Sequence, residues 1–195
     1  MQPHLVMAEF GPRVRSRLFS KKPSLKKRLN PTFESFFQYF PQAQLTLYTD
    51  QAYLQEQATE TITVRYIENT PFKKEHPRYY WHCNDYYKVL ALKECRSPIA
   101  LSLDADMRIV SSEFKQIMDY AKLFGICLPA NPRFQVKVDG IIGTDADYTK
   151  QEDPSEGNGL AVNMSPIAVT TQDPRAQRVL NAYLEEMETR PVRGP

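Results

Sequence analysis

One short run limits the possible folds of this chain more than any other: Pro98–Leu103 (PIALSL) is almost entirely apolar. A strand without polar alternation is typical of a parallel sheet that is covered on both faces. Three further candidate strands precede it, each followed by a helical or polar stretch, at residues 4–10, 45–48 and 62–67. Strands that alternate with helices predict an α/β fold with a mainly parallel central sheet flanked by helices.

The helices are predicted from apolar spacing and from capping residues. Asn30 and Pro31 are typical of a helix start, and the four phenylalanines that follow share one apolar face. Asn84 is interpreted in the same way, as the cap of a helix that ends near Cys95. Further helices are expected at 112–124 and from Asp173 or Pro174 to about 187, short strands at 126–128 and 160–164, and irregular chain at 131–157.

Two carboxylates follow the central strand directly, at Asp104 and Asp106. Their spacing after a strand predicts side chains that point roughly the same way, which suits a hard divalent cation such as Mg²⁺ or Mn²⁺. The alternative is a turn in which an aspartate caps the next helix. Charges at the end of a buried strand are costly unless they are paired or bind a metal, so we predict a metal site. Asp50 follows a second strand at the same edge, where open α/β sheets bind ligands.

The run NDYYKVLALKECRSPIALSLDADMRIV, residues 84–110, resembles the core of the GT-A glycosyltransferases, especially glycogenin and the related bacterial galactosyltransferases. Downstream, GNGLAVNM (157–164) is similar to their strand beside the donor sugar. The resemblance implies a GT-A (Rossmann-like) fold with a small acceptor-side extension. It implies a single catalytic domain over 1–195, with a nucleotide-sugar-binding half at 4–110 and an acceptor-side half at 111–195.

The resemblance also implies an activity: metal-dependent transfer of a hexose from a nucleotide-diphosphate sugar, usually UDP-linked, to a hydroxyl of a glycan or other acceptor. Mn²⁺ or Mg²⁺ is the implied cofactor. The implied donor-binding residues are Ala8, Glu9, Phe10, Asp50, Lys88, Asp104, Ala105, Asn158 and Gly159. Two of them have plainer interpretations: Lys88 as a helical partner of Asn84 or Asp85, and Asn158 as an ordinary loop residue.

The catalytic base stays open at the level of the sequence. An inverting transferase needs one carboxylate to deprotonate the acceptor, whereas a retaining one does not. Asp147 and Glu156 are preferred among the loop acids, the others being Asp139, Asp145 and Asp153. Tyr80 and Trp81 are predicted to bind the acceptor, with core packing as the alternative. All three histidines precede Asp104, so a third metal ligand is not identified.

Two other functions share these patterns. A nucleotidyltransferase that makes nucleotide sugars has the same general fold, although the stretch AEFGPRVRSR offers one glycine for a phosphate loop. An inactive homologue that binds nucleotide sugars, or serves as a scaffold, is the non-enzymatic alternative. Segment 13–28 is strongly basic and is either a phosphate or membrane-surface patch or a solvated loop. The net charge of +2 is too small to predict nucleic-acid binding.

Cysteine content and hydropathy bear on the compartment. Three widely spaced cysteines lack zinc-ligand spacing and favour reduced thiols, as in a cytoplasmic protein. The first ten residues, MQPHLVMAEF, do not resemble a signal peptide. No run approaches the roughly 20 apolar residues of a membrane span, so we expect at most a peripheral membrane contact.

Overall fold

The computed structural model describes residues 2–11, 25–76, 78–137, 140–142, 160–162 and 165–189. The strands are β1 (His4–Glu9), β2 (Gln44–Thr49), β3 (Ile62–Tyr66), β4 (Ile99–Ser102), β5 (Ile126–Cys127), β6 (Ala130–Lys137), β7 (Gly140–Ile142), β8 (Leu160–Val162) and β9 (Ile167–Thr170). The helices are α1 (Leu25–Tyr39), α2 (Tyr79–Glu94), α3 (Gln116–Phe124) and α5 (Pro174–Thr189), with 3₁₀ turns η1 (Ala52–Gln57) and η2 (Ser112–Lys115).

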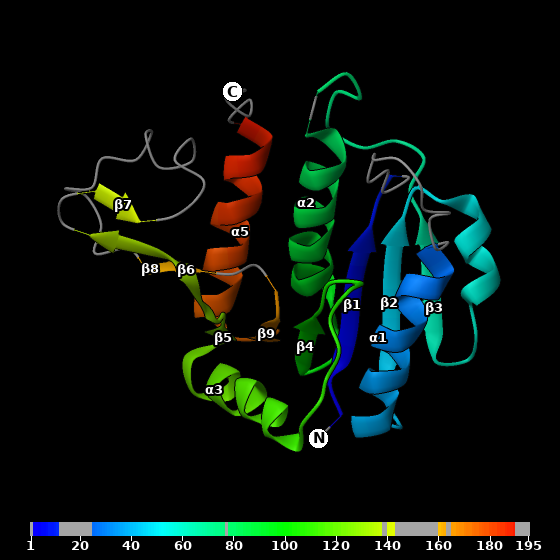
Figure 1. Cartoon of the computed structure of the whole chain (residues 1–195), viewed down its shortest axis with the longest axis horizontal. Coiled ribbons are helices and arrows are strands. Elements are labelled where there is room, and N and C mark those ends of the chain that lie inside the picture. The colour runs from blue at the N-terminus through cyan, green and yellow to red at the C-terminus, as the bar shows by residue number, and fades with distance from the viewer. Residues whose placement is uncertain are drawn as a thin grey trace.

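Six strands form the main sheet in the order β3-β2-β1-β4-β9-β5. The pairs β1–β2, β2–β3 and β1–β4 are parallel, whereas β9 runs antiparallel to both β4 and β5. The carboxyl ends of β1, β2 and β4 therefore lie together, at the upper edge of the sheet in Figure 1. A mixed, mostly parallel sheet flanked by helices confirms the predicted fold class, and β4 is buried at all four positions.

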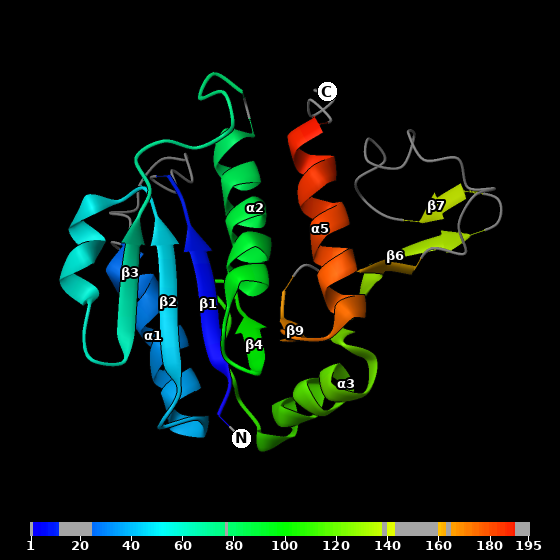
Figure 2. The ribbon, with the colours of Figure 1, turned by 180° about the vertical axis from the view of Figure 1, so that it is seen from behind.

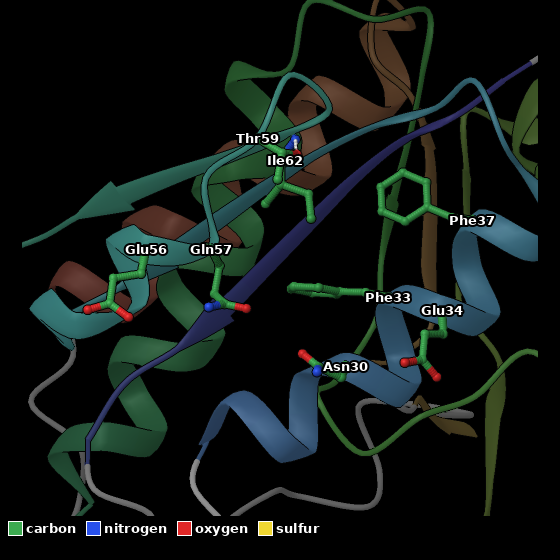
Figure 3. A pocket seen from close by; sticks show the side chains of 8 residues that line it. All are labelled: Asn30, Phe33, Glu34, Phe37, Glu56, Gln57, Thr59 and Ile62. Atoms are coloured by element: carbon green, nitrogen blue, oxygen red, sulfur yellow. Dashed lines mark hydrogen bonds between the residues drawn. The ribbon is translucent and has the colours of Figure 1, made fainter.

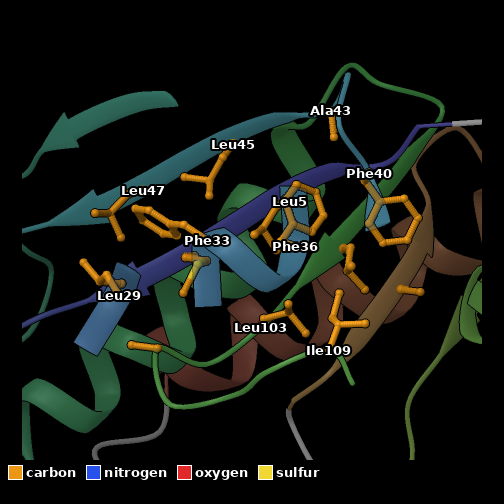
Figure 4. Close-up of a cluster of buried hydrophobic side chains, with 14 of the residues drawn as sticks. Leu5, Leu29, Phe33, Phe36, Phe40, Ala43, Leu45, Leu47, Leu103 and Ile109 are labelled. Atoms are coloured by element: carbon orange, nitrogen blue, oxygen red, sulfur yellow. The ribbon is translucent and has the colours of Figure 1, made fainter. Parts of the chain in front are cut away.

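The strands bury alternate residues on opposite faces, which places one apolar layer on each side of the sheet. In β1, Leu5 and Met7 pack in a cluster with α1, while Val6 and Ala8 pack in a second cluster with α2 and α5. Figure 4 shows the first cluster, in which Phe36 and its neighbours on α1 lie against the strands. Figure 2 shows α2 and α5 side by side. The result is a helix–sheet–helix sandwich.

Two helices begin earlier than the capping residues predict. Helix α1 starts at Leu25 and continues through Pro31, which lacks the N–H that an interior position would donate. Helix α2 starts at Tyr79 instead of at Asn84, and its cap position, Arg78, makes no side-chain capping bond. Asn84 is not a cap because its side chain accepts a hydrogen bond from the Phe10 backbone N–H, 2.8 Å away. The Asn84 side chain therefore binds a residue far away in the sequence and does not cap the helix.

The acceptor-side half also differs from the prediction. The segment expected to be irregular contains β6 and β7, which form a second sheet in the order β7-β6-β8. Within the predicted strand at 160–164, the structure has β8, which pairs antiparallel with β6. The strand beside β4 is β9, which the sequence interpretation missed because four residues after Ser165-Pro166 carry little periodicity. In the described part of the chain, no helix is long and apolar enough to cross a membrane.

Candidate functional site at the carboxyl edge of the sheet

Acidic residues gather where β1, β2 and β4 end. Glu9 is the last residue of β1, Asp50 directly follows β2, and Asp104 is the second residue after β4. The Oε1 atom of Glu9 accepts a hydrogen bond of 3.3 Å from the backbone N–H of Ala105, which ties the end of β1 to the chain after β4. Asp50 accepts a 2.8 Å bond from the Gly11 N–H and so ties the end of β2 to β1.

Asp104 to Met107 form a tight turn, which we call the acidic turn. The Met107 N–H donates to the Asp104 carbonyl at 3.0 Å, and an aspartate is favoured at the first position of such turns. The two carboxylates therefore stand in a turn and not on extended chain, the geometry from which their shared direction was predicted. Asp104 is half-buried and Asp106 is exposed, with the buried Ala105 between them. The alternative of a helix cap does not hold either, since Ser111 caps η2.

Lys88 reaches the acidic turn from α2. Its Nζ lies 2.5 Å from Asp104 Oδ1 and 3.6 Å from Asp85 Oδ1, and only 6% of its side chain is exposed. Burial lowers the pKa of this ammonium, but the charges of Asp104, Asp85 and Glu9 outweigh burial, so the net pKa is raised. The expected pairing with Asp85 exists, although it is buried and Asp104 is the nearer partner. One ammonium thus faces three carboxylates.

Two hydroxyl groups hold the backbone of the acidic turn. Ser165, just before β9, accepts a 2.9 Å hydrogen bond from the Asp104 N–H. Thr32 on α1 donates toward the carbonyls of Ala105, at 2.9 Å, and Met107, at 2.8 Å. The sequence interpretation missed both residues because an isolated serine or threonine gives no sign of a partner so far along the chain.

The remaining donor-site predictions fall on two kinds of position. The side chains of Ala8 and Phe10 are buried in the cluster on the α2 side, where Phe10 stacks on Tyr87 with ring centroids 4.8 Å apart. Glu9, Lys88 and Ala105 lie close to Asp104, and Asp50 lies at the end of β2, as described above. Asn158 and Gly159 lie outside the described residues, as do the acids proposed as bases, Asp139, Asp145, Asp147, Asp153 and Glu156.

Aromatic residues at the start of α2 border this edge. Tyr79 is buried, whereas the predicted acceptor residues Tyr80 and Trp81 are 44% and 49% exposed. The Tyr80 ring lies over the backbone of Gly11: a Cβ added there would meet the ring at 2.4 Å, and φ is +81°. The Arg78 guanidinium lies 5.4 Å from the Trp81 ring centroid. Both exposed rings therefore offer a surface for stacking.

A metal ion at the acidic turn would need ligands from a substrate as well as from the protein. Among the described residues, no group of three or more His, Cys, Asp or Glu side chains is arranged to hold a metal by itself. However, Mg²⁺ is commonly bound by one or two carboxylates together with substrate phosphates. Asp104 and Asp106 are the two carboxylates of the acidic turn, and Lys88 faces more carboxylates than its single charge neutralises.

A cavity of about 460 Å³ lies elsewhere, between α1, η1 and the start of β3. Figure 3 shows Phe33 and Phe37 on one side and the carboxylates of Glu34 and Glu56 at its rim. None of the predicted site residues lines it. We therefore locate the candidate site at the acidic turn and not in this cavity.

The described architecture is the fold shared by GT-A glycosyltransferases and nucleotidyltransferases. No family model matches the sequence, and no curated protein matches it. The solved structure of 4-diphosphocytidyl-2C-methyl-D-erythritol synthase from Anaerococcus prevotii aligns with a TM-score of 0.54 and 13% identity, covering 99% of this chain and 78% of that one.

Two longer proteins contain the same fold. The bifunctional IspDF from Campylobacter jejuni aligns with a TM-score of 0.52 and 11% identity over 94% of this chain and 47% of its own. The WbbM bifunctional glycosyltransferase gives 0.52 and 8% identity over 95% of this chain and 34% of its own. This chain thus spans about half of the first and a third of the second. At such identities the likeness concerns the fold.

Proposed function

We propose that this chain is a metal-dependent glycosyltransferase that moves a hexose from a nucleotide-diphosphate sugar, with UDP as the nucleotide, to a hydroxyl of a glycan or other acceptor. The supporting observation is the acidic turn at the carboxyl edge of the sheet, with its carboxylate–ammonium cluster. Ligands of open α/β sheets bind at this edge. The proposal also draws on the fold, which glycosyltransferases share.

Each residue at the edge has a distinct part in the proposed mechanism. Asp104 and Asp106 would hold Mn²⁺ or Mg²⁺, which neutralises the diphosphate leaving group when bound. Lys88 orients the Asp104 carboxylate through its ion pair. Tyr80 and Trp81 present exposed rings on which a sugar or base can stack. Asp147 and Glu156 remain the proposed bases for an inverting reaction.

The test is release of nucleotide from a panel of UDP- and GDP-sugars, with and without Mn²⁺. We expect metal-dependent release, and we expect Asp106→Ala to lower it by at least about 100-fold because a charge that organises the leaving group is lost. Asp119→Asn is the matched control, since Asp119 is an exposed acid on α3 that pairs with Lys122. Equal loss in both variants, or no release with any donor, would contradict the proposal.

Nucleotidyl transfer is the second candidate because the same fold occurs in the diphosphocytidyl-methylerythritol synthase. It predicts release of pyrophosphate from a nucleoside triphosphate in the presence of a sugar or polyol phosphate. Nucleotide release from a nucleotide sugar, without pyrophosphate, separates glycosyl transfer from it. Metal-dependent nucleotide binding without turnover on any substrate would instead favour the inactive homologue.

A further inference from the structure

Thr32 is a fully buried polar residue on α1, a helix that otherwise contributes apolar side chains to the core. Its hydroxyl lies 2.9 Å from the carbonyl oxygen of Ala105 and 2.8 Å from that of Met107. A hydroxyl has one hydrogen to donate, so the two carbonyls share it in a three-centre bond. These carbonyls stand on either side of Asp106. One side chain of α1 thus fixes the backbone both before and after the exposed carboxylate.

Ser35, one turn further along α1, extends this contact. Its hydroxyl donates to the Thr32 carbonyl at 3.0 Å and accepts a 3.1 Å hydrogen bond from the Ile109 N–H. Ser35 and Thr32 together hold three backbone groups between Ala105 and Ile109. We call these two residues the hydroxyl clamp.

The clamp binds carbonyl groups of the acidic turn, whereas the other contacts bind its side chains and N–H groups. Lys88 and Ser165 bind the side chain and the N–H of Asp104, where the turn begins. The hydroxyl clamp binds the chain around and after Asp106, where the turn ends. Because α2 binds the Asp104 carboxylate and α1 binds the carbonyls on either side of Asp106, the two contacts can be perturbed separately.

We propose that Thr32 is a positioning residue that sets the Asp106 carboxylate in its metal-binding orientation. This inference rests on the proposed function, since it gives Asp106 the role of a ligand for a cation shared with a nucleotide diphosphate. A group that must meet a metal and a diphosphate at once has to be held within about 0.5 Å of its productive position. A turn whose carbonyls are anchored meets that need before the substrate arrives.

The test compares Mn²⁺-dependent binding of UDP, measured by calorimetry, in the wild type, Thr32→Val and Thr32→Ser. Valine keeps the shape and removes the hydroxyl, so we expect roughly tenfold weaker binding, and misplacement of a liganding group can cost more than that. Serine restores the donor and should bind within about twofold of the wild type, a difference well below the 1.4 kcal/mol of a tenfold change.

Thr171→Val is the matched control for lost stability. Thr171 is 2% exposed and its hydroxyl donates to the Ser97 carbonyl at 2.7 Å, at the opposite end of β4 from the acidic turn. It should lower the melting temperature without changing the affinity for UDP. Equal weakening of binding in Thr171→Val and Thr32→Val would show that Thr32 acts through stability alone and would overturn the inference.

A double-mutant cycle with Asp106→Asn tests whether Thr32 affects UDP binding through Asp106. If Thr32 acts through Asp106, Thr32→Val should weaken binding no further once the carboxylate is gone. Additive losses would overturn the inference. In the metal-free protein, amide hydrogen exchange of segment 104–109 should rise in Thr32→Val and not in Thr171→Val, and unchanged exchange would also count against it.

The outcomes separate this inference from the proposed function. A wild type that binds no nucleotide in the presence of metal refutes the proposed function and the inference with it. If the wild type binds UDP and Thr32→Val binds it with equal affinity, only the positioning role of Thr32 is overturned. Should Thr32→Val fail to fold, Ser35→Ala is measured in its place, because it breaks only the contacts of Ser35 and is expected to weaken binding in the same direction.

Discussion

The buried ion pair of Lys88 holds the carboxylate at the start of the acidic turn. Lys88→Met removes the ammonium and leaves the half-buried Asp104 carboxylate without this partner. Breaking a buried pair from one side costs about 3–5 kcal/mol, and the partial exposure of Asp104 reduces our expectation to about 2–3 kcal/mol of unfolding free energy. Urea denaturation measures it. Lys122→Met is the control, because the exposed Lys122–Asp119 pair should contribute less than about 1 kcal/mol.

The raised pKa of Lys88 also predicts how the effect of Lys88→Met on stability changes with pH. The folded pKa of Lys88 is raised, so its contribution is fully present below the ordinary lysine value of 10.5 and is lost as pH rises through the folded pKa. The difference in unfolding free energy between wild type and Lys88→Met should therefore stay constant from neutral pH to about 10 and shrink above it. A difference that already shrinks between pH 7 and 9 would contradict the raised pKa.

At the residue scale, the sequence identifies groups whose chemistry is visible locally and misses those with distant partners. Asp104 and Lys88 are recognisable because charges stand beside an apolar strand and on a helix that precedes it. Thr32 and Asn84 are not, since Asn84 reaches a backbone N–H 74 residues away. Asparagine is common at helix starts, and this local preference led to the wrong start for α2.

At the element scale, α2 carries a stripe of residues that holds the carboxyl edge of the sheet. Tyr80, Asn84 and Lys88 are spaced by four positions, so they lie on one face of the helix. They contact the backbone of Gly11, the N–H of Phe10 and the carboxylate of Asp104, respectively. One helix therefore fixes the ends of both β1 and β4.

The middle residue of this stripe can be tested alone. Asn84→Ala leaves the buried N–H of Phe10 without its acceptor, so we expect a loss of about 1–3 kcal/mol of unfolding free energy. Hydrogen exchange at the Phe10 amide should accelerate at the same time. Gln177→Ala serves as control, since its side-chain amide also bonds the backbone, by donating to the Thr171 carbonyl at 2.7 Å, but from a half-buried position on α5. A larger effect of Gln177→Ala would argue against the stripe.

Strand order was the part of the architecture that the sequence could not supply. The parallel strands β1 to β4 follow from their apolar patterns and from the helical stretches between them. Strand β9 joins the sheet between β4 and β5 although it comes after both in the chain. Such an insertion depends on pairing between segments far apart in sequence, for which four residues (IAVT) give no local sign.

At the scale of the whole molecule, two apolar layers share one sheet. Phe36 belongs to the layer on the α1 side, and Leu180 belongs to the layer on the α2 and α5 side. Adjacent residues of β1 and β4 point into different layers, so neither layer can lose its packing while the strands between them stay in place. A single domain over 1–195, as predicted, should therefore unfold in one transition, in which the packing of both layers is lost together.

Phe36→Ala tests this prediction. Phe36 is fully buried, so its truncation should lower the free energy of unfolding by about 3–5 kcal/mol. Trp81, the single tryptophan, reports from α2 on the other face of the sheet, and far-ultraviolet circular dichroism reports from all elements. In one cooperative domain, the urea midpoints of both signals shift together in Phe36→Ala, whereas Leu123→Ala, at a site 66% exposed on α3, shifts neither.

A Trp81 transition that keeps its wild-type midpoint while the circular dichroism midpoint falls would mean that the two layers unfold independently. The acidic turn, which contacts α1 through Thr32 and α2 through Lys88, would then span two units, and its geometry would depend on their docking.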